Sequence, residues 1–291
     1  MPELAVIIPC HDAGPQLVEQ LDAVAASVSG LDVEVVLVDN RSTDGSMAAA
    51  ERWCARAPFT ARVVEASERP GEPHARNVGA GATTAPFLLY CDADDVVSSE
   101  WAPAMLAAFR GGAVYVGGPL DPDRLNAPWL RDVRGRSVLL QQASFEETVR
   151  FAHGANMGFR ADCLATIGGF DESWLISCDI EVGVRAHRAG VVPTWVDSAV
   201  VHYRFRPTLT ATYRQGREYG RARSRLRALA DDLVPEVVAR RDRRRRWRRM
   251  AWLARYAPRS VGDRAIRARW VWVAAQLDGE ARAWLAGKAG R

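Results

Sequence analysis

Short apolar runs alternate with segments of helical periodicity along the first 118 residues of the chain. The runs short enough to be buried strands are residues 4–9, 33–38, 61–65, 87–90 and 113–116. The segments expected to form helices between them are residues 15–29, 47–56, 75–82 and 101–109. Strands that alternate with helices favour a mostly parallel sheet covered by helices on both faces. The sequence therefore predicts an α/β fold.

The chain beyond residue 118 is less regular. Residues 119–150 carry several prolines and are expected to form a loop over the sheet. The helices expected next are residues 161–167 and 178–189, and the strands are residues 191–196 and 199–201. From residue 208 the chain is expected to be helical and basic. We therefore predict a sheet-containing domain over 1–205, divided into halves 1–118 and 119–205, and a helical region over 206–291.

Carboxylates follow three of the expected strands. Asp12 comes after the first strand, Asp39 ends the second, and the cluster Asp92–Asp95 follows the strand at residues 87–90. The carboxyl ends of parallel strands lie at one edge of a sheet, and ligands of open α/β sheets bind there. We expect these carboxylates to converge on one ligand site. Asp44, in contrast, is expected only to cap a helix.

Asp92 and Asp94 are separated by a single small residue, Ala93. This spacing suits one hard cation, Mg²⁺ or Mn²⁺, together with the phosphates that such a cation bridges. An alternative interpretation is a solvated acidic turn, because Asp is a common turn residue. Asp179 and Glu181 open a later helix, where the helix dipole alone can account for one of the two.

Composition limits the class of protein. The chain has 291 residues, of which 48% are hydrophobic, and no apolar run approaches the length of a membrane span. Its N-terminus lacks the basic region and cleavage site of a signal peptide. The cysteines form no zinc-type spacing and are expected to be reduced; they are Cys10, Cys54, Cys91, Cys163 and Cys178. We expect a cytoplasmic location.

Charge is distributed unevenly along the chain. Residues 204–291 hold 24 Lys and Arg against 8 Asp and Glu, although the net charge of the whole chain is only +4. Three interpretations of this region are open: a solvated helical face, attachment to an anionic membrane surface, and nucleic-acid binding. Trp247, Trp252, Trp270 and Trp272 favour the membrane slightly. We expect no nucleic-acid partner.

Seven sequence blocks occur in an order that resembles family 2 glycosyltransferases of the GT-A fold. The first four are Val-Ile-Ile-Pro at 6–9, Leu-Val-Asp-Asn-Arg-Ser-Thr-Asp-Gly-Ser at 37–46, Ala-Arg-Asn-Val-Gly at 75–79 and Asp-Ala-Asp-Asp at 92–95. The others are Gly-Ala-Asn-Met at 154–157, Ile-Gly-Gly-Phe-Asp-Glu at 167–172 and Asp-Ile-Glu at 179–181. The resemblance covers about residues 4–205. It implies a Rossmann-like sheet, a nucleotide-sugar donor, a divalent metal and an inverting hexosyl transfer.

The resemblance also implies roles for residues of the half at 1–118, the nucleotide-binding half. Pro9 and Asp12 match the first nucleotide-binding turn, although most relatives have an aromatic residue where His11 stands. Asp39 matches the carboxylate that contacts the base, usually uracil, so a UDP-sugar is the expected donor. The residues matched to the diphosphate and the ribose are Arg76 and Asp92.

The metal and the base follow from the same resemblance. Asp94 matches a metal ligand, Asp179 in the acceptor half matches the general base, and His202 resembles a histidine that completes the metal shell in some relatives. A structural role for His202 stays equally open. The family usually has Glu-Asp where this chain has Cys178-Asp179. The residues expected in the vicinity of the donor sugar are Ala93, Gly154 and Asn156.

Two other functions are alternatives to glycosyl transfer. A sugar nucleotidyltransferase is disfavoured because residues 9–14 lack a glycine-rich, basic signature. A non-catalytic sugar-nucleotide-binding protein is disfavoured by the intact Asp92, Asp94 and Asp179. The acceptor stays open between a cell-envelope or lipid-linked glycan and a small natural product. A dinucleotide-binding fold is excluded, because no Gly-x-Gly-x-x-Gly turn follows the first strand.

Overall fold

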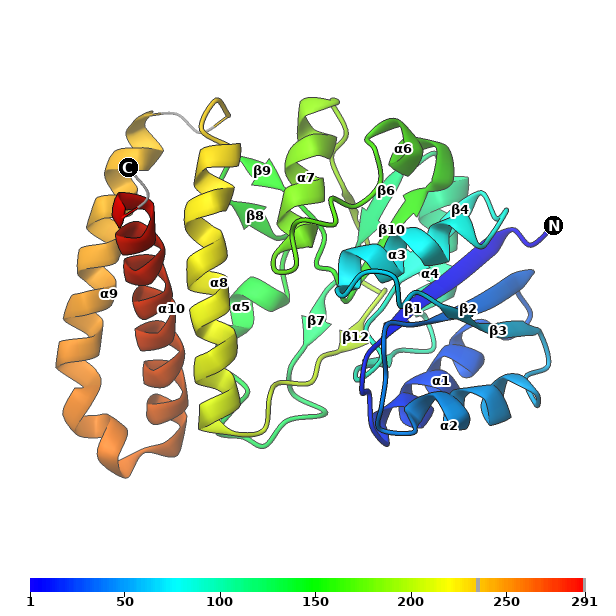
Figure 1. The fold of residues 1–291 in the computed structure, drawn as a ribbon, viewed down its shortest axis with the longest axis horizontal. Helices are drawn as coiled ribbons and strands as arrows, with labels where there is room; N and C mark the ends of the chain where they lie inside the picture. Colours follow the sequence, from blue (N-terminus) through cyan, green and yellow to red (C-terminus); the bar gives the residue numbers. More distant parts are fainter. Residues whose placement is uncertain (234–235, 290–291) are drawn as a thin grey trace. The chain divides into compact units, whose positions relative to one another are not determined.

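The computed structural model describes residues 1–233 and 236–289 and divides the chain into two compact units (Figure 1). The sheet unit comprises residues 1–121, 140–143 and 150–203. The helical unit comprises residues 122–139, 144–149 and 204–291. The change of unit at residues 203 and 204 lies near the boundary predicted at 205, but most of the segment 119–150 groups with the helices. Each unit is described by itself below.

A seven-stranded sheet forms the centre of the sheet unit. Its spatial order is β11-β6-β10-β4-β1-β2-β3, and only β10 runs antiparallel to its neighbours. The strands are β1 (Leu4–Cys10), β2 (Val33–Asp39), β3 (Thr60–Glu65), β4 (Phe87–Tyr90), β6 (Tyr115–Gly117), β10 (Met157–Arg160) and β11 (Thr194–Trp195). The prediction of a mostly parallel α/β sheet is confirmed.

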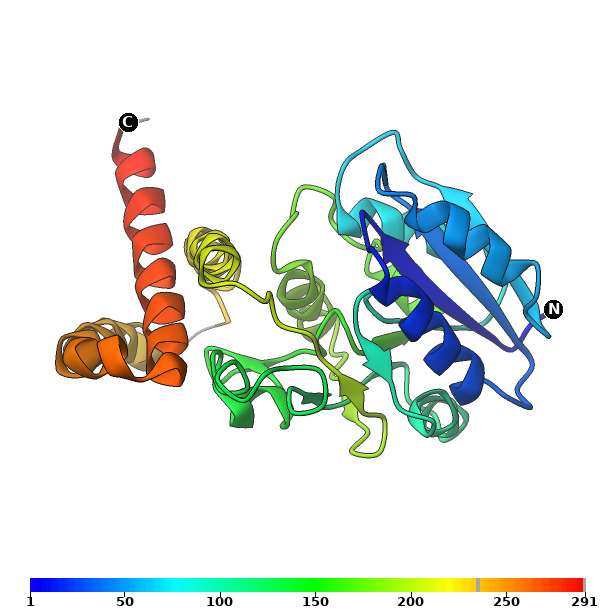
Figure 2. The same ribbon diagram turned by 90° about the horizontal axis from the view of Figure 1, so that it is seen from below.

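Helices cover both faces of this sheet (Figures 1 and 2). On one face lie α1 (Gln16–Ser27), α2 (Ser46–Cys54) and α4 (Trp101–Arg110). On the other lie α3 (Glu72–Gly81), α6 (Ala161–Thr166) and α7 (Cys178–Arg188). The core on this second face joins alternate residues of the strands, such as Ile7 and Val36, to Ala75 of α3 and Val182 of α7. Alternate residues of a strand point to opposite faces, so every central strand is buried on both sides.

Gly79 allows α3 to lie close against the sheet. A Cβ atom at this position would come within 2.4 Å of the Ile7 side chain and 2.9 Å of the Val38 side chain. Any larger residue would push α3 away from β1 and β2. The start of the same helix carries Glu72 and Arg76, so the glycine helps to set the distance between these side chains and the strand ends.

A second, three-stranded sheet lies in the sheet unit. It consists of β5 (Val96–Val97), β12 (Val201–His202) and β7 (Leu120–Asp121), in that order. The pairing places His202 opposite Val96 on one side and opposite Asp121 on the other. This brings the end of the last predicted strand next to the loop that carries Asp94.

The helical unit contains three long helices. They are α8 (Leu209–Leu229), α9 (Glu236–Gly262) and α10 (Arg264–Ala289), and the short α5 (Arg136–Leu139) belongs to the same unit. Glycines bring α8 and α10 together, because a Cβ at Gly220 would lie 2.2 Å from the Gln276 carbonyl oxygen and one at Gly279 would lie 2.1 Å from that of Arg217. Among the residues that the structure describes, no helix is long and apolar enough to cross a membrane.

Several local predictions differ from the structure. Residues 119–150 are not a plain loop, since they contain β7, α5 and the paired strands β8 (Ser144–Phe145) and β9 (Val149–Arg150). The strands predicted at 191–196 and 199–201 shrink to the two-residue β11 and β12. The strands β5 and β10 were not predicted from the sequence.

Candidate active site

The loops that follow β1 and β2 are tied together at the carboxyl edge of the sheet. Cys10 and Asp39, the last residues of the two strands, are paired in register. Beyond them, Asp12 has a left-handed backbone (φ 48°), and its carboxylate accepts a hydrogen bond of 2.6 Å from the Thr43 amide. The Asp39 carboxylate accepts one of 2.9 Å from the Ser42 amide. Asp12 and Asp39 therefore belong to two loops that are connected by hydrogen bonds. Pro9 lies on β1, just before the first of these loops.

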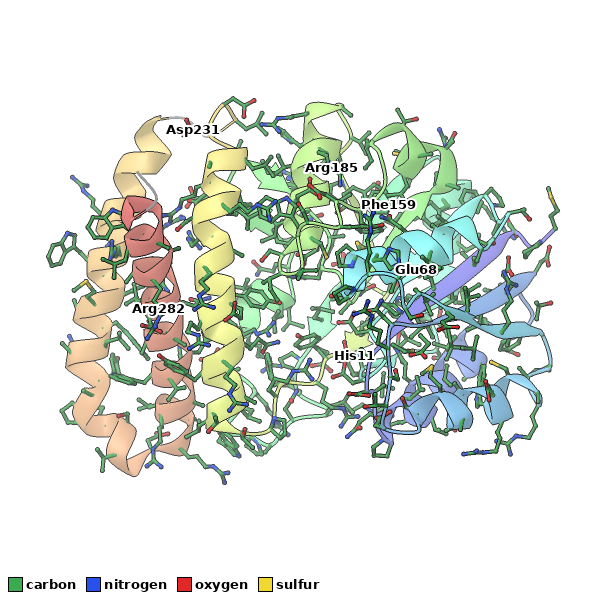
Figure 3. All side chains as sticks on the ribbon, in the orientation of Figure 1. His11, Glu68, Phe159, Arg185, Asp231 and Arg282 are labelled. Atoms are coloured by element: carbon green, nitrogen blue, oxygen red, sulfur yellow. The ribbon has the colours of Figure 1, made fainter. Side chains whose placement is uncertain are left out.

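His11 and Asp44 strengthen the same connection. The His11 ring, labelled in Figure 3, forms a 2.8 Å hydrogen bond between Nδ1 and the Asn40 carbonyl oxygen. Asp44 accepts hydrogen bonds of 2.9 Å from the Ser46 amide at the start of α2 and of 2.8 Å from the Gly14 amide. The first bond reaches the first residue of α2, but the N-cap residue of this helix is Gly45, so Asp44 lies one position before the cap that was predicted for it. The second bond was not predicted.

Arg76 is the centre of the second group of site residues. Its side chain is only 1% exposed, and it forms ion pairs with Glu72, one turn earlier on α3, and with Asp92, 3.5 Å away. Its Nη1 atom donates to the Cys178 sulfur over 3.2 Å, and its guanidinium lies 5.4 Å from the Phe170 ring. Burial acts against the charge, but the Glu72 carboxylate and the other acidic neighbours raise the pKa of Arg76 above its ordinary value. Arg76 is therefore a fixed cation at this edge of the sheet.

Asp179 lies in the first turn of α7, beside this cation. Its carboxylate accepts hydrogen bonds from the Gly154 amide over 3.2 Å and from the Ile180 amide over 2.9 Å. Gly154 leaves no room for a side chain, because a Cβ there would lie 2.7 Å from Nη2 of Arg76. The structure thus brings together four residues that are far apart in the sequence: Arg76, Asp92, Gly154 and Asp179.

The Asp92 carboxylate lies between the Arg76 cation and other acidic side chains. Its side chain is 30% exposed but densely surrounded. Burial, followed by the neighbouring Glu72 carboxylate, raises the pKa of Asp92 well above its ordinary value, although Arg76 lowers it. The carboxylates of Glu72 and Asp92 face the single guanidinium of Arg76, and such an excess of negative charge favours a cation bound nearby.

Asp94 and His202 are the predicted metal ligands. Strand pairing places His202 opposite Val96, two residues after Asp94, and the His202 Nδ1 atom lies 2.9 Å from Oδ2 of Asp121. Such a carboxylate contact orients an imidazole so that its other nitrogen can bind a metal. Within residues 1–233 and 236–289, no group of three His, Cys, Asp or Glu side chains is arranged to hold a metal ion. Mg²⁺-type sites often use one or two carboxylates with phosphate oxygens and water, so a site of that type does not require three protein side chains.

Asn156, one of the residues predicted near the donor sugar, has a fully buried side chain. Its side chain is 0% exposed and forms three hydrogen bonds. It accepts one from the Trp101 indole over 2.9 Å and donates to the carbonyl oxygens of Pro119 and Ala199 over 3.0 and 2.8 Å. We therefore propose no direct hydrogen bond from this side chain to a sugar. Ala93 is also nearly buried, at 7% exposed.

Glu181 is explained by a buried ion pair within its own helix. It is 2% exposed and accepts two hydrogen bonds, of 2.6 and 2.7 Å, from Arg185 one turn later on α7. Arg185, labelled in Figure 3, also donates to the Ile167 carbonyl oxygen. Of the two acidic residues that open α7, Asp179 faces the site residues and Glu181 stabilises the helix against the preceding loop.

Carboxamide side chains, buried at Asn40 and partly buried at Asn77, hold the loops around the site, and sequence reasoning missed them. Asn40 donates to the Ala66 and Arg69 carbonyl oxygens and accepts from the Gly71 amide. Asn77 donates to the Phe170 carbonyl oxygen over 2.8 Å and accepts from the Phe170 amide over 2.9 Å. Both residues lie inside the motifs at 37–46 and 75–79, so the motifs were the only available signal. Gln20 is a third carboxamide of this kind, and it lies outside every motif. Glu72, the carboxylate that pairs with Arg76, also lies outside the motifs, so no sequence signal pointed to it.

Comparison with protein families and curated proteins gives consistent matches. The family model described as glycosyl transferase family 2 matches residues 5–168, and the one described as glycosyl transferase family group 2 matches residues 87–285. A curated relative, glycosyltransferase AglE of Haloferax volcanii, is 23% identical over 209 residues, which are 71% of this chain and 68% of AglE.

Solved structures share the fold at low sequence identity. Mannosyltransferase PcManGT from Pyrobaculum calidifontis, solved with GDP-Man and Mn²⁺, has a TM-score of 0.62 at 19% identity, over 96% of this chain and 87% of PcManGT. TarS from S. aureus, residues 1–349 with UDP-GlcNAc, has a TM-score of 0.56 at 15% identity, over 96% and 93% of the two chains. These likenesses confirm the GT-A fold that the sequence predicted, with a helical C-terminal region.

Proposed function

Because the chain belongs to glycosyl transferase family 2, we propose that it transfers a sugar, with inversion, from a nucleotide-diphosphate sugar to a hydroxyl group of an acceptor. The observation that carries this proposal is the convergence of Asp12, Asp39, Arg76, Asp92 and Asp179 at the carboxyl edge of one sheet. Such an edge is where ligands of open α/β sheets bind.

The proposed donor site uses the tied loops for the nucleoside and the buried cation for the diphosphate. Pro9, Asp12 and Asp39 contact the nucleoside, and Asp39 is assigned to the base. UDP is the proposed nucleotide, although PcManGT was solved with GDP-Man and TarS with UDP-GlcNAc. Asp92 contacts the ribose, and Arg76 faces the diphosphate, since its side chain is fixed there by Glu72 and Cys178.

A divalent cation, Mn²⁺ or Mg²⁺, is proposed between Asp94, His202 and the diphosphate. When bound, it supplies positive charge to the leaving nucleoside diphosphate. Arg76 supplies the protein's own positive charge to the same group, and the interaction is strengthened because its side chain is only 1% exposed and little water screens it. Asp121 keeps the His202 ring in one orientation, because it contacts Nδ1 at 2.9 Å.

Asp179 is the proposed general base. The acceptor hydroxyl oxygen forms a bond to the anomeric carbon while the bond from that carbon to the diphosphate oxygen breaks, and the hydroxyl proton passes to the Asp179 carboxylate. A single displacement of this kind inverts the anomeric centre. The Gly154 and Ile180 amides hold the two carboxylate oxygens of Asp179, so its position does not depend on the acceptor.

The test compares Asp179→Asn with a matched control, Asp162→Asn. Asp162 also lies in the first turn of a helix and accepts from the next amide, that of Cys163, over 2.7 Å, but its side chain is 66% exposed. Transfer to an acceptor panel should fall about 10²–10⁴-fold in Asp179→Asn, as expected for loss of a general base. Nucleotide binding should stay within about twofold. Near-full turnover of Asp179→Asn would refute the assignment, and turnover with any acceptor excludes a non-catalytic binding protein.

We further propose an anionic membrane surface as a partner of the helical unit, which suits a lipid-linked or envelope acceptor. The sequence from residue 243 to residue 262 contains no acidic residue. On α9, Trp247 is 70% exposed and Met250 is 45% exposed, and Arg244, Arg246 and Arg248 around them are also exposed. An exposed tryptophan flanked by arginines is typical of helices that lie in a membrane interface.

Vesicle binding tests this partner. The protein should sediment with vesicles containing phosphatidylglycerol but not with phosphatidylcholine alone, and binding should fall as salt is raised. Trp247→Ser with Met250→Ser should weaken binding about tenfold. The control is Val138→Ser, which removes an apolar side chain of the same unit that is 58% exposed. Equal binding to neutral and anionic vesicles would contradict the electrostatic part of the proposal.

A further inference from the structure

Gln20 of α1 is a buried polar residue that bridges both ends of the acidic loop after β4. Its side chain is 0% exposed. The Nε2 atom donates a hydrogen bond of 2.9 Å to the Asp92 carbonyl oxygen. The Oε1 atom accepts one of 3.0 Å from the Val97 amide. One carboxamide thus connects the residue that opens the loop to the strand β5 that closes it.

The loop between these two anchors carries closely spaced negative charges. Asp92 is paired with Arg76 at 3.5 Å, and Asp94 follows it by two residues. Like charges this close in a loop disfavour one another, so the backbone that carries them gains from being held at both ends. A neutral amide restrains both ends without adding charge. A buried lysine or arginine at position 20 would instead compete with a metal for the carboxylates.

We propose that Gln20 is a positioning residue for metal binding, which acts on Asp94 through the backbone of the loop. The inference rests on the proposed function, since it assigns Gln20 to the same donor and metal site. Gln20 is not a ligand, because both ends of its amide are bonded to backbone groups. Its effect is to hold Asp94 ready for the cation, so that less cation is needed to order the loop.

A purely structural role is the competing explanation, and α1 offers a matched residue for it. Ser27 lies seven residues after Gln20 and is 2% exposed. Its hydroxyl donates to the Ser99 carbonyl oxygen over 3.2 Å and accepts from the Ala102 amide over 3.0 Å. Ser27 therefore does for the start of α4 what Gln20 does for the acidic loop, but it anchors no candidate metal ligand.

The experiment measures the Mn²⁺ concentration that half-saturates binding of UDP, or of GDP if the wild type binds that instead, by calorimetry. Gln20→Met keeps the length of the side chain and removes both hydrogen bonds. It should raise this Mn²⁺ concentration about tenfold, while nucleotide binding without metal stays within about twofold. Gln20→Asn, which keeps the amide but is one methylene too short to reach both anchors, should give a smaller rise. Ser27→Ala should lower the melting temperature without changing the Mn²⁺ requirement.

Two outcomes would overturn the proposal. If both Gln20 variants melt earlier but keep the wild-type Mn²⁺ requirement, the residue has only a structural role. If Ser27→Ala raises the requirement as much as Gln20→Met, the effect reports general loosening of the unit. A wild type that shows no metal-dependent nucleotide binding would instead refute the proposed function, and with it the metal that Gln20 is proposed to serve.

Discussion

The loops around the candidate site in the sheet unit and the long helices of the helical unit are connected mainly by different kinds of polar group. In the sheet unit, neutral carboxamides hold the loops around the site; they are Gln20, Asn40, Asn77 and Asn156. In the helical unit, the long helices are connected by buried carboxylates that pair with arginines. Glu146, whose side chain is 3% exposed, lies 2.6 Å from Arg223 and 3.4 Å from Arg245, and Glu280 lies 2.8 Å from Arg249.

The difference distinguishes two uses of acidic side chains. In the helical unit they stabilise the fold by pairing with arginines, and at the edge of the sheet they lie where a ligand is proposed to bind. In the helical unit, arginines cancel the buried carboxylates, so part of the basic sequence is used inside the unit. At the edge of the sheet, Arg76 faces Glu72 and Asp92. The carboxamide side chains hold the loops there without adding positive charge. Two carboxylates thus face one guanidinium, and the divalent cation that we propose would add positive charge beside them.

The largest expected effect is on the stability of the helical unit. Glu146→Gln removes the buried carboxylate that Arg223 and Arg245 share, but these two side chains are 33% and 37% exposed, so water can partly replace it. The expected cost is therefore about 2–3 kcal/mol, below that of breaking a fully buried pair. The matched control is Glu147→Gln, which removes a 53% exposed partner of Arg245 and should cost about 0–1 kcal/mol. Urea unfolding followed by circular dichroism measures both. Equal small losses would mean that the buried network is not stabilising.

Arg76→Met is expected to reduce the free energy of nucleotide binding by a comparable amount. The change removes the cation that faces Glu72 and Asp92, so these carboxylates should repel a diphosphate. Nucleotide affinity should fall about 100-fold, the size of a lost charged hydrogen bond of about 2–3 kcal/mol. Calorimetry with saturating Mn²⁺ measures the change. An affinity within threefold of the wild type would show that Arg76 is structural, as the arginines of the helical unit are.

The smallest expected effect is at the start of α8. Thr208 is the N-cap residue of this helix, and its hydroxyl accepts from the Ala211 amide over 3.2 Å. Thr208→Ala should destabilise the helical unit by about 1 kcal/mol, the usual contribution of such a cap. The same urea unfolding experiment measures it, and nucleotide binding should not change. A loss larger than that of Glu146→Gln would reverse the ranking of capping and buried charge in this unit.

The sequence predicted the sheet and the residues at its edge because both leave local patterns. Apolar runs such as residues 33–38 mark strands, and carboxylates directly after them mark strand ends. The strand β10 was not predicted because its pairing with β4 depends on a close approach of the two backbones. A Cβ at Gly158 would lie 2.5 Å from the Leu89 side chain. A glycine in a short apolar run gives no such information from the sequence alone.

The buried polar networks could not have been predicted. Gln20 bonds to a residue 72 positions away, and Arg245 bonds to Glu146 across 99 positions. A glutamine in a helix or an arginine in a basic run has no sequence pattern that distinguishes a buried bridge from a solvated side chain. Charge asymmetry along the chain suggested a surface function for the arginines, and it did not reveal that some of them are internal partners.

The most direct test of the account is calorimetric titration with UDP, GDP and dTDP, with and without Mn²⁺, on the wild type and on Asp94→Ala. Asp162→Ala, which removes an exposed carboxylate at the start of α6, serves as the control. The account predicts that one nucleotide binds in a metal-dependent manner, that Asp94→Ala abolishes this dependence and that the control retains it. If no nucleotide binds the wild type with metal present, or if Asp94→Ala binds as the wild type does, the carboxylate edge is not a metal-assisted donor site.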